Sequence, residues 1–547
     1  MSRPPVSLGF VLVTSACVTL AGCDLVLGLD NYKEGPATGG AGGGTTASAS
    51  TDASTSMSSG PSSSSSSSGM PCELNTTMEC YSGTPSSTKD VGDCRHGTAT
   101  CDANGVFGAC VGEVLPAAVD DYDKKGDENC DGSPTSDSLW VHDFGAPYIA
   151  ATAVGVDGSI FIAGNFSGSL KLGPSTLIAN AQDGFVAKLD PLGAPLWAAQ
   201  VSASDEQAIT DVAVDSAGSV FVTGNSRQPL VLGSDNMPTG IFIAKYSSGG
   251  TLAWARGCGG TTYSTGKAIA ITPTNDVVMV ADFNGTANCG SGSYTTGNNM
   301  QALLAKWSGG GTAMWSKGFT GPAPSYANTS AIAVDPVGNV WAAGGMDGTI
   351  NVGKSITASG AFLTKFTPAG GHIQAGPFNN CGIVAMDVDS LGGPVLGFAG
   401  PASVGTTCNV GGVDYSGPAI ARLDSSAGVM WSTPIGSLFD LVLDDTDAGW
   451  VVGGFSSSTL TLPGNVLTKH SAYDAFVWRF DPQGKQMYTK QYSGADASSF
   501  AGLTSCASAP NGDLVAVGNL QSAADFGTGN ILTMGGAIDF VALKVAH

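Results

Sequence analysis

From position 139 onward the sequence repeats with a period of 57 to 61 residues, and this repeat restricts the possible folds more than any other feature. In six of the seven periods an aromatic residue closes a short apolar segment, and Gln374 stands at that place in the other one. The seven positions are 140, 197, 254, 315, 374, 431 and 488, which lie 57, 57, 61, 59, 57 and 57 residues apart. Such regular repetition predicts a row of similar structural units.

Each period predicts four short strands. An apolar strand ends near an acid and a Gly turn, as at Val214-Asp215, and a second strand ending in Gly follows. After a variable stretch comes a third strand with one base, and a turn leads to the aromatic strand. The bases are Lys188, Lys245, Lys306, Lys365, Arg422 and Arg479. Four strands per unit, repeated seven times, predict an all-β fold, a seven-bladed β-propeller.

The chain ends predict how the ring closes. The last period supplies three strands, ending in Phe540–Lys544, and no repeat precedes the first aromatic strand, Ser138–Phe144. Pairing these two strands completes the seventh blade and removes a sheet edge that would otherwise be exposed. The alternative is an open β-solenoid or a chain of sandwiches, whose periods are usually shorter or less regular.

The repeat resembles that of bacterial β-propeller-repeat proteins of the SBBP type. Residues 160–197 carry this likeness best, with an aliphatic strand after Asp157-Gly158 and the turn sequence LDPLGAPLW. The likeness extends over residues 136–547 and implies a fold and an exported binding or surface role. It implies no catalytic residue.

The N-terminus predicts export and anchoring. Arg3 precedes a short apolar stretch, Leu8–Leu20, which is typical of a signal peptide over residues 1–22. Leu20-Ala21-Gly22-Cys23 resembles the lipobox of bacterial lipoproteins, which implies diacylglycerol on Cys23 and a membrane partner. Two or three acyl chains give stable anchoring. We expect the outer membrane or cell surface, with the inner membrane as an alternative, and an ordinary signal peptide with a chance Cys is the competing interpretation.

Between the anchor and the repeats lie a tether and a small module. Residues 23–70 are rich in Gly and Ser and predict a flexible coil that holds the folded part off the membrane. Residues 71–135 contain Cys72, Cys80, Cys94, Cys101, Cys110 and Cys130, which predict three disulfides with fifteen possible pairings. A zinc site is not expected, because there is no CxxC pair and His96 is the only histidine of the module.

The module ends in an acidic run. Oxygen donors recur at Asp121, Asp123, Asp127, Asn129 and Asp131 and are followed by Gly132. Hard cations prefer six to eight oxygen ligands, so calcium is the ion we expect if this segment binds a metal. The run resembles the Asp-rich putative metal-binding motif of bacterial surface proteins, although Lys124 and Lys125 interrupt it. A solvated acidic linker is the alternative.

The repeats contain five cysteines. Cys258 and Cys289 flank the first half of one period, and Cys381 and Cys408 occupy the same places two periods later. The matching positions predict two disulfides, each within one blade. Cys506 is left over on an apolar strand, where a buried free thiol is common.

Several chemical functions are not expected. The formal charge of −22 argues against a nucleic-acid partner. The segment Gly348–Ser355 fits the P-loop spelling GxxxxGKS, but it lies between two strands of a repeat with no helix after it, so no nucleotide is expected. The recurrent bases predict either one ion pair per blade, which we favour, or a ring lining a channel.

These observations together predict a lipid-anchored, extracytoplasmic binding protein that recognises a protein or a glycan and is not an enzyme. Specificity is expected in the variable stretches, which are residues 225–240, 283–300, 399–417, 455–473 and 519–538. Two alternatives are a lyase or hydrolase acting on an extracellular polymer, and a scaffold for envelope assembly. No certain cofactor is expected.

Overall fold

The computed structural model describes residues 72–546 apart from 84–87, 92, 117–137, 146, 262, 298, 402–404, 495–496 and 526–530. The chain divides into two compact units, Met1–Thr135 and Ser136–His547. Within the described ranges, no helix has the length and apolar character needed to cross a membrane.

The first unit is a small hairpin held by disulfides. Strands β1 (Thr77–Cys80) and β2 (Gly97–Thr100) pair antiparallel. Disulfides join Cys72 to Cys101 and Cys80 to Cys110. Cys94 is also disulfide-bonded. The buried residues include Ala99, Cys80, Cys94 and Cys101, so cross-links take the place of a larger apolar core.

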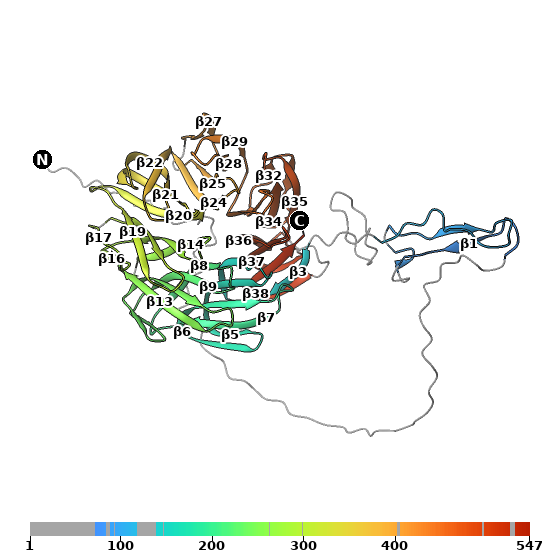
Figure 1. Ribbon diagram of the computed structural model, residues 1–547, viewed down its shortest axis with the longest axis horizontal. Coiled ribbons are helices and arrows are strands. Elements are labelled where there is room, and N and C mark those ends of the chain that lie inside the picture. The colour runs from blue at the N-terminus through green and yellow to red at the C-terminus, as the bar shows by residue number, and fades with distance from the viewer. Residues whose placement is uncertain are drawn as a thin grey trace, which may run out of the picture. The chain divides into compact units, whose positions relative to one another are not determined.

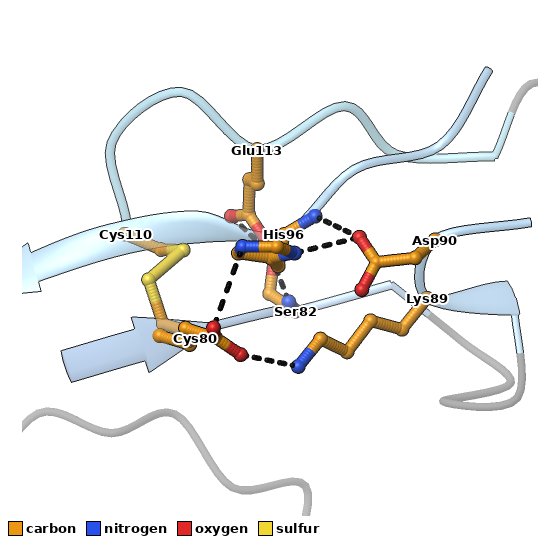
Figure 2. Close-up of a disulfide and its surroundings, with 8 residues drawn as sticks. Cys80, Ser82, Lys89, Asp90, His96, Cys110 and Glu113 are labelled. Carbon is orange, nitrogen blue, oxygen red and sulfur yellow. Dashed lines mark hydrogen bonds and ion pairs between the residues drawn. A yellow bond between two sulfur atoms is a disulfide. The ribbon is translucent and has the colours of Figure 1, made fainter.

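Polar groups surround one of these disulfides, as Figure 2 shows. The His96 ring lies between two carboxylates, with Nδ1 2.6 Å from Asp90 and Nε2 3.7 Å from Glu79. Lys89 approaches Glu79 to 3.0 Å. The charges and hydrogen bonds of these partners lower the pKa values of both Glu79 and Asp90. These exposed contacts are local and contribute little to stability.

The second unit consists of seven antiparallel sheets built on four strands each, the blades, and two short strands of blade 3 extend the sheet of blade 2. Figure 1 shows the blades arranged radially, with β8, β14, β24 and β36 nearest the centre. Blades 1 to 3 contain, from the innermost strand outward, β4 (Tyr148–Val154), β5 (Ile160–Leu172), β6 (Ser175–Leu189) and β7 (Pro195–Val201); β8 (Gln207–Val214), β9 (Val220–Ser226), β12 (Gly240–Tyr246) and β13 (Leu252–Gly259); and β14 (Thr265–Ile271), β15 (Val277–Phe283), β18 (Gln301–Trp307) and β19 (Ala313–Phe319).

The other four blades follow the same order. They contain β20 (Tyr326–Val334), β21 (Val340–Asn351), β22 (Ser355–Phe366) and β23 (His372–Asn379); β24 (Cys381–Val388), β25 (Pro394–Pro401), β28 (Ala419–Leu423) and β29 (Val429–Pro434); β30 (Asp440–Leu443), β31 (Gly449–Phe455), β34 (Asp474–Phe480) and β35 (Gln486–Tyr492); and β36 (Phe500–Ser508), β37 (Leu514–Asp525), β38 (Ile531–Val545) and β3 (Ser138–Asp143).

The predicted closure of the ring is confirmed. Strand β3 pairs with β38 in register Trp140 to Lys544, and the Phe144 N–H donates to the Phe540 carbonyl at 2.9 Å. The innermost strands also contact one another in a complete circuit, in which β36 of blade 7 lies against β4 of blade 1. The seven-bladed propeller predicted from the repeat is therefore the fold.

The core lies between the blades. Each sheet packs both faces against neighbouring blades, so residues on both sides of its middle strands are buried instead of alternating between core and solvent. All seven residues of β15 and all seven of β18 are buried. One apolar cluster joins Phe161 of blade 1 to Val222 of blade 2, and similar clusters fill the other junctions. This packing fixes each blade by its neighbours.

The connections between the second and third strands form projecting hairpins, here called the arms. Four arms form short strand pairs, which are β10 (Leu230–Leu232) with β11 (Asp235–Met237), β16 (Thr286–Asn288) with β17 (Ser293–Thr295), β26 (Cys408–Val410) with β27 (Val413–Tyr415), and β32 (Thr459–Leu462) with β33 (Asn465–Thr468). The others extend β5–β6, β21–β22 and β37–β38. The GxxxxGKS segment forms the tip of the β21–β22 arm.

Candidate binding sites of the propeller

The two faces of the ring differ in their connections. Because neighbouring strands are antiparallel, turns between first and second strands share one face with turns between third and fourth strands. The former are called inner turns (155–159, 215–219, 272–276, 335–339, 389–393, 444–448 and 509–513) and the latter outer turns (190–194, 247–251, 308–312, 367–371, 424–428 and 481–485). The arms begin at the opposite end of the strands.

A funnel opens on the face of the inner turns. The innermost strands of blades 1 to 6 end in aliphatic residues, which are Val154, Val214, Ile271, Val334, Val388 and Leu443. They line a hollow of about 550 Å³ together with residues of the inner turns. Further apolar side chains stand on these turns, with Val156, Val337 and Leu391 exposed by 71, 75 and 80%. Convergent exposed apolar groups of this kind are typical of an interaction surface.

The inner turns also carry acids, and most of these acids hold the fold. Asp335 at the start of one turn accepts backbone N–H groups of Val337 and Asn339. Its other oxygen lies 3.1 Å from the Lys365 Nζ of the same blade. Both side chains are almost fully buried, with 6% of Lys365 and 2% of Asp335 exposed.

All seven blades have such a pair between the third strand and the inner turn. The pairs are Lys188–Asp157, Lys245–Asp215, Lys306–Asp276, Lys365–Asp335, Arg422–Asp389, Arg479–Asp444 and Lys544–Asp513, with nitrogen–oxygen distances of 2.6 to 3.6 Å. The recurrent bases thus form one ion pair per blade. Lys544 was missed as a member of this series.

The acid of the pair occupies different positions of the inner turn in different blades, but every blade keeps the ion pair. Gly155, Thr272 and Ala509 begin three of the inner turns, where the other four have Asp. In these three blades the acid stands two or four residues later, as Asp157, Asp276 and Asp513. An unpaired buried base would be costly, so each sequence change is compensated within the same turn.

Three further carboxylates lie deeper on the innermost strands. Asp211 accepts the backbone N–H of Ile269 in the next blade at 2.7 Å, Asp387 that of Leu443 at 2.8 Å, and Asp440 that of Cys506 at 2.9 Å. Burial raises the pKa of Asp211 to about 7 and those of Asp387 and Asp440 to about 6. These acids connect neighbouring blades around the channel.

The aromatic positions of the repeat connect the blades at the outer edge. The indole N–H of an outermost strand donates to a carbonyl in the outer turn of the next blade at five junctions. The bonds are Trp140 to Pro191, Trp197 to Ser248, Trp254 to Gly309, Trp315 to Pro368 and Trp431 to Pro482, at 2.9 to 3.2 Å. This repeated contact is here called the indole latch.

A glycine in each of these turns makes room for the ring. A Cβ on Gly250, Gly311 or Gly370 would lie 2.7 to 2.9 Å from the indole of the preceding blade. The junction between blades 4 and 5 has neither residue of this contact. Gln374 stands in place of the Trp, and Ala427 stands in place of the Gly. A hollow of about 460 Å³ lies at this junction, lined by both residues.

The sequence-predicted site residues fall into two groups. Cys23, Cys130, Asp121, Asp123, Asp127, Asn129 and Asp131 lie outside the described residues. In the described part the structure brings together Cys258 with Cys289 and Cys381 with Cys408, each within one blade. Cys506 forms no disulfide and is buried. Within the described residues no group of three or more His, Cys, Asp or Glu side chains is arranged to hold a metal ion.

Disulfides persist mainly outside the cytoplasm. The four described pairs therefore indicate an extracytoplasmic location. The variable stretches are arms with a buried apolar side, shown by Leu230, Leu232 and Met237. The funnel was not foreseen, because valines at the ends of strands look like ordinary core residues until the ring brings them together.

No family model and no curated protein matches the chain. Three similar solved structures are the Dos1 propeller (9% identity, 75% of this chain and 95% of that chain, TM-score 0.40), the WD40 domain of Neurospora crassa Pan2 (10%, 75% and 97%, 0.39), and virginiamycin B lyase from Staphylococcus aureus with quinupristin (10%, 74% and 99%, 0.38). At this level of similarity they say nothing about a ligand or a reaction.

Proposed function

We propose that this chain is a lipid-anchored, extracytoplasmic binding protein whose propeller recognises a segment of another protein at the funnel. The observation that carries the proposal is the convergence of six aliphatic strand ends in a hollow of about 550 Å³. Val156 lines this hollow, and the exposed Val337 and Leu391 each stand next to a lining residue of an inner turn. Apolar side chains that remain exposed on a rigid scaffold favour a partner that covers them.

Charge indicates the chemistry of the partner. Asp445 stands exposed among the residues that line the funnel, and the whole chain carries a formal charge of −22. A segment with aliphatic side chains flanked by Lys or Arg would match this surface and approach it faster. We favour binding over catalysis because the channel carboxylates Asp211, Asp387 and Asp440 accept backbone N–H groups of neighbouring blades.

A peptide library displayed on phage and selected on the full chain tests the funnel. We expect enrichment of aliphatic residues with Lys or Arg, and weaker binding as salt rises. Leu391→Glu should weaken the selected peptides at least tenfold. Leu192→Glu is the matched control, because Leu192 is a 74% exposed leucine in an outer turn on the same face. Equal effects of the two substitutions, or selection of acidic peptides, would contradict the proposal. A glycan array run in parallel tests the alternative that the chain binds a glycan.

Anchoring needs its own experiment. The proposal rests on Leu20–Cys23 and is compatible with the extracytoplasmic disulfides. Cys23→Ser should move the chain from the membrane fraction to the soluble fraction, whereas Cys17→Ser should leave it in the membrane. Membrane retention of the Cys23→Ser protein would contradict a lipid anchor at this residue. Calcium binding by residues 121–131 stays a prediction from the sequence.

A further inference from the structure

The junction between blades 4 and 5 lacks both parts of the indole latch. Gln374 replaces the latch tryptophan of the outermost strand, and Ala427 replaces the glycine that faces it. Trp341 stands on the second strand, where blades 1 and 2 have Phe161 and Phe221 and blade 6 has Trp450. Trp341 is fully buried and donates to the Gly392 carbonyl of blade 5 at 3.2 Å. An indole thus fills the interior, and the outer part of the junction remains hollow.

Trp341, Leu363 and Val429 line the hollow, together with residues of three elements that meet at the outer edge of the ring. Strand β23 supplies Gln374 to Phe378, the β26–β27 arm supplies Asn409, Gly411 and Gly412, and the outer turn of blade 5 supplies Ser426 and Ala427. The Nε2 atom of Gln374 is buried and has no hydrogen-bond partner among the described residues. A buried amide without a partner is unusual in a packed interior. Its N–H groups can donate to the face of an aromatic ring.

The outer turn of blade 5 keeps the geometry that receives an indole elsewhere. Ala427 has a φ of 63°, and its N–H donates to the Asp424 carbonyl at 2.9 Å, as the glycine does in the other outer turns. At the junction of blades 2 and 3 the Gly309 carbonyl accepts both the Lys245 Nζ and the Trp254 indole.

At blade 5 the corresponding carbonyl, that of Ser425, accepts the Lys365 Nζ at 3.3 Å. A carbonyl oxygen has two lone pairs, so this one has capacity for a second donor of the kind that the indole supplies elsewhere.

We infer that this hollow is a second binding site, which takes the exposed tryptophan side chain of a partner protein. The indole would stand on the outer turn of blade 5, donate to the Ser425 carbonyl and contact the Gln374 amide. The Cβ of Ala427 keeps the ring a little farther from the turn than a built-in latch, which suits a side chain that enters and leaves. The site lies at the outer edge of the ring and is independent of the funnel.

Fluorine NMR of N-acetyl-5-fluorotryptophan amide with the full chain tests this inference. We expect the fluorine signal of this probe to broaden when the protein is added. Unlabelled N-acetyltryptophan amide should reverse the broadening, and methyl glucoside should not. Gln374→Trp places an indole of the chain in the hollow and should weaken binding at least tenfold. Ile373→Trp is the matched control, because Ile373 is the neighbouring residue, 44% exposed and outside the hollow, and binding should stay within twofold.

A third variant keeps the inference falsifiable if Gln374→Trp does not fold. Ala427→Gly removes the methyl group beneath the ring at a φ that glycine adopts freely, so binding should become at least threefold tighter. Equal effects of the two tryptophan variants, no gain from Ala427→Gly, or displacement by methyl glucoside in place of the tryptophan amide would overturn the inference. The funnel proposal would be unaffected, because Leu391→Glu reports it separately.

Discussion

Carboxylates of the ring differ in protonation because their surroundings differ. Asp211 on β8 accepts the backbone N–H groups of Ile269 and Val212, and burial raises its pKa to about 7. Asp424 in an outer turn is exposed, and hydrogen bonds from Ser426 and Gly428 lower its pKa. Burial disfavours a charge, whereas N–H and O–H donors favour it. The pH dependence of stability should therefore contain opposing contributions from different acids.

Asp211 provides a prediction with a definite sign. Between about pH 4 and pH 7 the folded chain holds a proton on Asp211 that the unfolded chain has lost, so its contribution to stability is present at low pH and disappears as pH rises through the folded pKa. Asp211→Asn stays neutral and keeps one oxygen for the Ile269 N–H. We expect its Tm, relative to that of the unsubstituted chain, to rise by about 2–4 °C between pH 5 and pH 8.

The control for this prediction is Asp445→Asn, which removes the same charge from an exposed position. Its Tm relative to the unsubstituted chain should change little over the same interval. A difference for Asp211→Asn that stays constant with pH, or that falls as pH rises, would show that Asp211 is ionised in the folded chain.

The residues of the repeat could be predicted only in part from the sequence, because several of them function in pairs whose second member is not evident. The bases were recognisable because they always stand on the third strand. Their acids were harder to find, because Asp276 and Asp513 stand four residues after the usual position. The Gln374–Ala427 exchange has meaning only once the structure places the two residues, which are 53 positions apart, at one junction.

At the scale of elements, five of the seven junctions between blades depend on an outer turn that receives the indole latch. Gly311 has a φ of 82°, and a Cβ there would lie 2.7 Å from the Trp254 ring. Gly311→Ala should destabilise the chain by about 2–3 kcal/mol, because left-handed strain and a clash with a rigid ring add together. Thermal unfolding followed by circular dichroism measures this effect.

Gly168→Ala separates the two causes. Gly168 has a φ of 70°, but a Cβ there would meet no heavy atom within 4 Å. This variant should lose only about 1–2 kcal/mol from backbone strain. If both substitutions lower the stability by the same amount, contact with the indole does not restrict the turn. The glycines are then needed only for their positive φ.

Elements were the most predictable level of this protein. Strand order, the seven units and the β3–β38 pairing follow from the period, because each blade needs the same strands and the same turns. The funnel and the hollow at blades 4 and 5 could not be read from the period, since both depend on side chains from several blades that meet only in the closed ring. The arms were taken as variable loops, but their alternating leucines, such as Leu460 and Leu462, pack as core.

For the whole molecule, the seam between β3 and β38 determines whether the ring is one cooperative unit. Strand β3 comes from the start of the ring and β38 from its end, as the cyan and red strands side by side in Figure 1 show. Replacing Ser138–Asp143 by a Gly/Ser segment of equal length would leave β38 as an exposed edge and remove the strand pairing that joins the start of the ring to its end. We expect a lower Tm, faster hydrogen exchange in both β4 and β37, and concentration-dependent association through the free edge.

The same replacement of β29, Val429–Pro434, is the matched control. It also has six residues, is an outermost strand and carries a latch tryptophan, Trp431, as β3 carries Trp140. The control should lose stability at blades 5 and 6 and keep the exchange of β4 unchanged, because the β3–β38 pairing still joins the start of the ring to its end. Identical exchange patterns in the two variants would mean that the seam has no special role and that each blade is held by its two neighbours alone.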